Sequence, residues 1–146
     1  MISCHRFALV MPAILLILGG CGEGGINKAD PANERAVQMG EGIYAENCAK
    51  CHGGNLEGEP DWQVKRADGT LPAPPHNDNG HTWHHNDDLL FNYTKLGGSE
   101  ILPKNIKSAM PAFAGTLSDE QIWAVLSFIK SKWSIEVQKN QSALNK

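Results

Sequence analysis

Apolar residues recur at the spacing of an α-helix in the C-terminal part of the chain. Ser118 and Gln121, three residues apart, have the identities of a helix capping box. The large apolar residues that follow are Ile122, Val125, Leu126, Ile129 and Trp133. Because residues three and four apart share one face of a helix, the pattern predicts a helix over 118–133 whose apolar stripe lies in the core.

A second helix is predicted between Asn86 and Gly97. Asn86 is a favourable N-cap residue, and Asp87 and Asp88 place acidic side chains in the first turn, where they interact well with the helix dipole. The segment "DDLLFNYTKLGG" then ends at Gly97.

Two other stretches lack such a pattern. Residues 22–33, "GEGGINKADPAN", are polar, rich in glycine and contain a proline, which predicts a flexible tether. Residues 134–146 have no apolar face, so we expect a frayed tail.

The first twenty residues have the pattern of an export signal. Arg6 precedes an apolar run from about Phe7 to Leu18, which is short for a membrane span and has the proportions of a secretory signal. "LGGC" resembles the lipobox of bacterial lipoproteins, in which Cys21 is acylated and becomes the mature N-terminus. Its acyl chains would anchor the protein to a bacterial membrane. The alternatives are an uncleaved anchor or a secreted protein, and each places the domain outside the cytoplasm, in the periplasm or beyond the cell.

The whole chain is small and mildly acidic. Its 146 residues, of which 20% are charged, suit one small globular domain with appendages. A formal charge of −3 and the lack of a dense Lys/Arg face argue against nucleic acid as a partner.

The cysteines of the domain indicate a site for a bound group rather than a stabilising disulfide. Cys4 and Cys21 belong to the N-terminal segment, which leaves Cys48 and Cys51 in the domain. A disulfide between these two would close a loop too small to restrain much of the chain. Together with His52 they form the C-x-x-C-H pattern of covalent c-type haem attachment, in "CAKCHG".

The spacing of this motif has a physical reason. Residues three and four apart face the same side of a helical turn, so Cys48 and Cys51 can both reach the vinyl groups of a porphyrin while His52 faces the iron. A thioredoxin-type motif would need a βαβ context, which the flanking sequence does not show. A zinc site would need a fourth ligand from the later histidines.

Three segments of the chain have the order and character of one known family. "GEGIYAENCAKCHGGNLEG" (40–58) is similar to a first helix that leads into the attachment site, "AMPAF" (109–113) to a distal methionine loop, and "SDEQIWAVLSFIKSKW" (118–133) to a C-terminal helix. The chain thus resembles the class I monohaem c-type cytochromes. The resemblance implies an all-α cytochrome c fold, with about four helices packed around one covalently attached haem c. We expect the C-terminal helix to cross the first helix near Gly40, where the missing side chain lets the backbones approach. The expected division is a signal peptide (1–20), a lipidated cysteine and tether (21–33), a cytochrome c domain (34–134) and a tail (135–146).

Met110 is the candidate for the second axial ligand of the iron. Met1 and Met11 belong to the signal segment, and Met39 lies on the helix that enters the attachment site. Pro111 biases Met110 towards an extended backbone, from which a thioether can reach an iron atom and raise its reduction potential. The alternative is a methionine that packs in the core.

Histidines around "GHTWHH" (80–85) leave two further alternatives open. One of them could replace Met110 as the axial ligand, or several could form an auxiliary copper or zinc site. A plainer interpretation makes 80–85 a supporting loop that leads into the helix beginning after Asn86. The histidines concerned are His76, His81, His84 and His85.

The resemblance also implies two supporting residues. An axial histidine usually donates its other ring N–H to a carbonyl, and the family uses a proline carbonyl for this. Pro74 is the best candidate, with Pro72 and Pro75 as alternatives, because the long polar stretch 54–70 departs from shorter family members. The indole N–H of Trp83 is expected at a haem propionate.

These residues predict an electron carrier rather than an enzyme. A haem with both axial positions filled by side chains has no open site for a substrate. We expect a monomer that binds protein redox partners transiently at the haem edge, with Lys95, Lys104 and Lys107 favouring an acidic partner. The alternatives are a haem peroxidase with a labile Met110 and a metal-sensing or metal-handling protein that uses the histidine loop.

Overall fold

The computed structural model describes residues 24–146, and this part of the chain is all-α, as predicted. The only β-type pairing in these residues is an isolated bridge between Thr70 and Lys107. Helices α2 and α4 are single turns of four residues, too short for periodicity to reveal, so the helices outnumber the four expected. The elements are α1 (Glu34–Asn47), α2 (Ala49–His52), the 3-10 turn η1 (Thr82–His84), α3 (Asp87–Leu96), α4 (Gly98–Ile101), α5 (Asp119–Ser131) and α6 (Ile135–Ser142).

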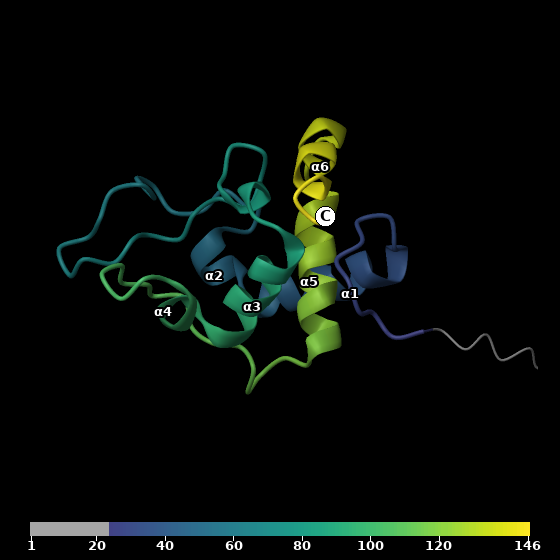
Figure 1. The fold of residues 1–146 in the computed structure, drawn as a ribbon, viewed down its shortest axis with the longest axis horizontal. Helices are drawn as coiled ribbons and strands as arrows, with labels where there is room; N and C mark the ends of the chain where they lie inside the picture. The colour runs from purple at the N-terminus through teal and green to yellow at the C-terminus, as the bar shows by residue number, and fades with distance from the viewer. Residues whose placement is uncertain (1–23) are drawn as a thin grey trace, which may run out of the picture.

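The core is built where α1 and α5 cross, near the centre of the molecule (Figure 1). The crossing is at Gly40, as predicted: a Cβ there would overlap the backbone carbonyl of Ala124 and press on Phe128. Because glycine has no side chain, the two backbones touch directly at this point. The predicted stripe of α5 is buried throughout, at Ile122, Val125, Leu126, Ile129 and Trp133.

The end signals of α3 and α5 act as the sequence predicts. Ser118 and Gln121 form the complete capping box of α5. The Asn86 side chain accepts a hydrogen bond from the backbone N–H of Leu89, and Gly97, with φ of +83°, ends α3. Helix α5 ends at Ser131, two residues before the predicted end.

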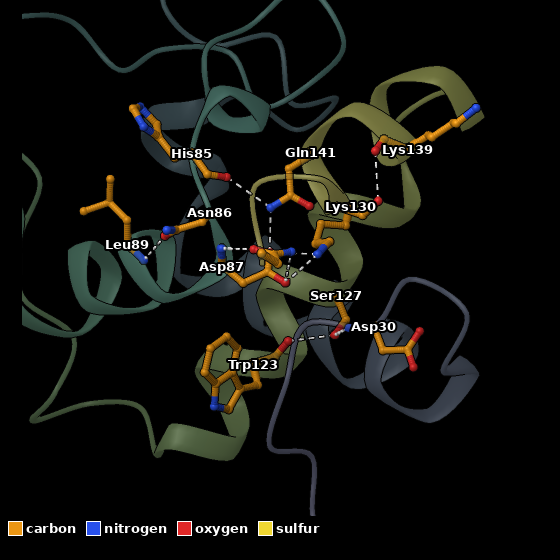
Figure 2. A network of polar contacts seen from close by, with 12 residues as sticks. Asp30, His85, Asn86, Asp87, Leu89, Trp123, Ser127, Lys130, Lys139 and Gln141 are labelled. Atoms are coloured by element: carbon orange, nitrogen blue, oxygen red, sulfur yellow. Dashed lines mark hydrogen bonds and ion pairs between the residues drawn. The ribbon is translucent and has the colours of Figure 1, made fainter.

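The expected frayed tail is corrected by the structure, which has helix α6 there. Gln141 of α6 is fully buried. Its Nε2 donates to the backbone oxygen of His85 at 3.0 Å and to the Asp87 carboxylate at 2.7 Å (Figure 2). Polar contacts therefore hold α6 in place, and a search for apolar periodicity could not detect them.

A buried ion pair lies at the centre of the same contacts. Lys130 of α5 places its Nζ 2.7 Å from each carboxylate oxygen of Asp87, at the start of α3 (Figure 2). The Lys130 side chain is 6% exposed. Asn145 adds a side-chain hydrogen bond to the same carboxylate at 3.0 Å. The Asp87 carboxylate thus joins α3, α5 and the C-terminal segment.

The tether predicted over 22–33 is also corrected, from Ile26 onwards. Ile26 and Ala29 are buried in the core. The backbone N–H of Asp30 donates to Ser127 Oγ on α5 at 2.9 Å (Figure 2). The burial of these two apolar residues, together with this hydrogen bond, holds the otherwise polar stretch against α5.

The predicted signal peptide and Cys21 lie outside the described residues. Within residues 24–146, none of the helices combines the length and the apolar character that crossing a membrane requires.

Replacing Gly40 should disrupt the α1–α5 crossing. We expect Gly40→Ala to lower the free energy of unfolding by at least about 2 kcal/mol, since the added methyl overlaps backbone that cannot move aside. Denaturant unfolding of the haem-loaded protein measures this. Gly42→Ala is the matched control on the same helix, because nothing lies within 4 Å of its Cβ position. There we expect a gain of about 0.5–1 kcal/mol from helix propensity, and equal effects at both sites would contradict the close approach.

Removing one partner of the buried ion pair should be costly. We expect Lys130→Met to lower the free energy of unfolding by about 3 kcal/mol, because it strands the Asp87 carboxylate in a largely buried position. Lys95→Met, which breaks the more exposed pair between Lys95 and Asp119, should cost less than about 1 kcal/mol. Similar losses of unfolding free energy in the two variants would contradict a larger contribution from the buried Lys130–Asp87 pair.

Candidate haem site

Beside the α1–α5 crossing, the fold encloses a cavity of about 590 Å³ with largely apolar walls. This volume lies within the range of about 300–1,000 Å³ typical of cofactor sites. The walls come from the end of α1, from α2, α3, α4 and α5, and from the loops between them. The predicted site residues that line the cavity are Cys48, Cys51, His52, Pro74 and Met110.

The attachment motif lies where α1 ends and α2 begins. The backbone N–H of Cys48 closes the last turn of α1, and the N–H groups of Cys51 and His52 bond back to the Cys48 carbonyl at 3.1 and 3.0 Å. Both cysteines are free thiols, Cys48 buried and Cys51 exposed. Burial raises the pKa of the Cys48 thiol to about 11. Two free thiols, which can form thioether bonds to a porphyrin, next to a ring nitrogen that can bind iron are the groups that covalent haem attachment requires.

The ring of His52 is held by one hydrogen bond. His52 is 6% exposed, and its Nδ1 lies 2.9 Å from the carbonyl oxygen of Pro74. Because a carbonyl can only accept, the proton is on Nδ1 and the lone pair is on Nε2. Burial lowers the pKa of His52, while the bond to Pro74 opposes that change. The neutral ring that results is the form that binds a metal.

Backbone pairing holds the Pro74 carbonyl in position. The N–H of Gly58 donates to the His52 carbonyl at 2.8 Å, and the N–H of Glu59 donates to the Ala73 carbonyl at 2.9 Å. Gly58 has φ of +70°, and a Cβ there would overlap the backbone at Pro74. The segment that follows the haem motif is therefore paired to the segment before the histidine loop, and this pairing brings Pro74, rather than a neighbouring proline, to His52.

The long polar stretch forms a loop that reaches the methionine segment. Arg66 places Nη2 2.7 Å from both carboxylate oxygens of Glu59. The backbone N–H of Ala73, which donates to the Glu59 carboxylate, and these contacts with Arg66 lower the pKa of Glu59. At the far end of the loop, Lys107 donates to the Asp68 carbonyl at 3.1 Å. In Figure 1 this loop extends from the body of the molecule on the same side as α4.

Met110 is anchored through its backbone and lines the cavity. Its N–H donates to Ser108 Oγ at 3.1 Å, and its carbonyl accepts from the N–H of Gly98 at 3.1 Å. Gly97 packs so closely on Pro111 and its neighbour that a Cβ would collide there. The structure thus places Met110 and His52 on the wall of one cavity.

Three of the four histidines in and just before residues 80–85 line the cavity. His76, His81 and His85 line it, whereas His84 stacks on Trp83 with ring centroids 3.8 Å apart. The His81 and His85 rings are nearly perpendicular, with centroids 4.7 Å apart. In the described part of the chain, no group of three or more His, Cys, Asp or Glu side chains is arranged to hold a metal ion. The auxiliary metal site therefore gains no support from this geometry.

The structure differs from expectation at Trp83. Its indole N–H donates to the Asp78 carbonyl at 3.1 Å, and the residue does not appear on the cavity wall. Trp62 and Arg66, which no sequence argument singled out, do line the cavity. They lie in the polar stretch, where no periodicity or motif signals a role. The sequence predicts a possible metal ligand at His76, but in the structure the His76 ring contacts His52 directly, and the position of His76 two residues after Pro74 is the available signal.

Comparison with known families agrees with this geometry. The family model described as "Cytochrome C oxidase, cbb3-type, subunit III" matches residues 35–129, from the start of α1 to near the end of α5. No curated protein and no solved structure gives a match. The matched span contains the C-x-x-C-H motif and every residue of the cavity wall, and it covers more than half of the sequence. The chain is a c-type cytochrome that binds covalent haem, and it belongs to the cbb3-type cytochrome c oxidase subunit III family.

Proposed function

We propose that this protein is a membrane-tethered electron carrier whose haem has His52 and Met110 as its axial ligands. The observation that carries the proposal is that both residues line one apolar cavity, next to the two attachment cysteines. The bound haem supplies an iron that alternates between the ferric and ferrous states. Met110 as a ligand would favour the ferrous state relative to a second histidine.

The chain's own residues prepare this site in three ways. Pro74 holds the proton of His52 on Nδ1, so the lone pair on Nε2 is available to the iron. The backbone of Met110 is tied to Gly98 and Ser108, which limits how far its thioether can move. The apolar side chains of α5 in the cavity wall exclude water, which keeps small the reorganisation that accompanies electron transfer.

Redox partners would dock where the site reaches the surface. Cys51 is exposed, so the attachment edge is accessible from outside. Among the lysines expected to favour an acidic partner, Lys95 is paired with Asp119 at 2.7 Å. Lys107 donates to the carbonyl oxygen of Asp68 and takes part in none of the ion pairs found in residues 24–146. We therefore propose Lys104 and Lys107, rather than Lys95, as the charges that attract an acidic partner.

The sixth ligand can be tested by spectroscopy of the ferric protein. We expect the wild type to be low-spin, with the weak near-infrared band of methionine ligation, and Met110→Ala to lose that band. Met39→Ala, a control at a methionine packed against the core on α1, should retain it. A low-spin wild type without the band, unchanged by Met110→Ala, would mean that a histidine is the sixth ligand. A high-spin wild type would instead favour a peroxidase.

The proposed anchor can be tested by metabolic labelling with a palmitate analogue in a bacterial host. We expect label on the wild type and none on Cys21→Ser, because the acyl groups attach at the lipobox cysteine. Cys4→Ser changes the other cysteine of the N-terminal segment and should remain labelled. An unlabelled wild type, or label that survives Cys21→Ser, would contradict the tether.

A further inference from the structure

His76 lies face to face with the proposed axial ligand. The rings of His76 and His52 are stacked, with centroids 3.9 Å apart and planes inclined by 20°. His76 follows Pro74 by two residues, so one short segment contacts His52 twice. Pro74 holds the edge of the His52 ring, and His76 covers one of its faces.

The His76 ring is fixed by contacts of its own. Its Nδ1 lies 2.5 Å from Oγ1 of the buried Thr82. The ring of Tyr44 meets it edge to face, with centroids 6.3 Å apart. Its backbone is fixed on both sides, since its carbonyl accepts from the indole N–H of Trp133 at 2.6 Å and its N–H donates to the Leu56 carbonyl at 2.8 Å. A ring held in this way presents a rigid flat surface to His52.

The bond to Pro74 fixes only the Nδ1 edge of the His52 ring. Small changes in the side-chain torsions of His52 can still tilt the ring plane, and in the haem-loaded protein this tilt would set the angle between the ring plane and the porphyrin nitrogens. A flat ring packed at 3.9 Å on its face opposes the change, because any tilt breaks van der Waals contact on one side and creates overlap on the other.

His76 cannot itself be the sixth ligand in this arrangement. A sixth ligand would have to approach a bound haem from the face opposite His52, whereas the ring of His76 lies against the ring of His52 itself. The contact therefore acts through His52 rather than on the iron.

We propose that His76 is a positioning residue that fixes the orientation of the axial His52 ring. The inference rests on the proposed function, since it needs His52 to bind the iron. What matters is a flat ring at position 76: a phenylalanine would serve, and an aliphatic side chain would not.

The test compares haem-loaded His76→Leu and His76→Phe with the wild type. The readouts are the NMR shifts of the four haem methyl groups and the EPR g-values of the ferric protein, which depend on the orientation of the axial ring. We expect His76→Leu to change the order or narrow the spread of the methyl shifts, and His76→Phe to keep the wild-type pattern. Thr82 retains the Pro75 carbonyl, at 3.5 Å, as a partner in the phenylalanine variant.

A histidine outside the cavity wall provides the matched control. The ring of His84 stacks on Trp83 and contacts His81, so His84→Leu should leave the methyl pattern unchanged. If His76→Leu does not mature with haem, His76→Val is measured in its place, with the same expectation.

The outcomes separate the two proposals. A wild-type pattern in the aliphatic variant, even one with lowered stability, would overturn the positioning role, and so would equal changes in the leucine and phenylalanine variants. A wild type that lacks the signature of histidine and methionine ligation would overturn the proposed function instead.

Discussion

The direct contact between the backbones of α1 and α5 at Gly40 is the constraint on which the rest of the structure depends. It holds α1 against α5, and the attachment motif begins at Cys48, the residue that caps α1. It also turns the inner face of α5 towards the cavity, where Val125, Leu126 and Ile129 form part of the wall. One missing side chain thus places the haem motif and the apolar surface opposite it.

Around this crossing, polar contacts hold together segments that a larger domain would hold together by apolar packing in its core. A chain of this size buries a modest fraction of its surface, and a large cofactor cavity replaces part of the possible side-chain packing. The Lys130–Asp87 pair joins α5 to α3, and Gln141 brings in α6 (Figure 2). The Glu59–Arg66 pair closes the base of the long loop. These contacts need specific geometry, which limits how the segments around the cavity can move.

The ring of His52 is likewise held by only a few residues. Its ring is bonded at one edge by Pro74 and covered on one face by His76, and both residues belong to a single segment. That segment is in turn paired with residues 56–59, which follow the haem motif directly. The part of the site around His52 is therefore built from two short stretches of the chain. Met110 comes from a separate loop tied to Gly98. The two proposed axial ligands thus have independent supports.

The sequence alone determined what depends on near neighbours. The capping box at Ser118, the limits of α3 and the spacing of the C-x-x-C-H motif are all set within three or four residues, so they could be predicted. The crossing at Gly40 was expected from the resemblance to the c-type cytochromes, because Gly42 on the same helix is equally small and has nothing near its Cβ position.

Only the tertiary structure decided the features that join distant residues. Gln141 bonds to His85 from 56 positions away, and Asp30 bonds to Ser127 from 97 positions away. No local pattern records such pairs, and for that reason the tail and the tether were mispredicted. The stacking of His76 on His52 has the same cause: a histidine's identity suggests a ligand, but whether it binds, bonds or packs depends on what the fold places against its ring.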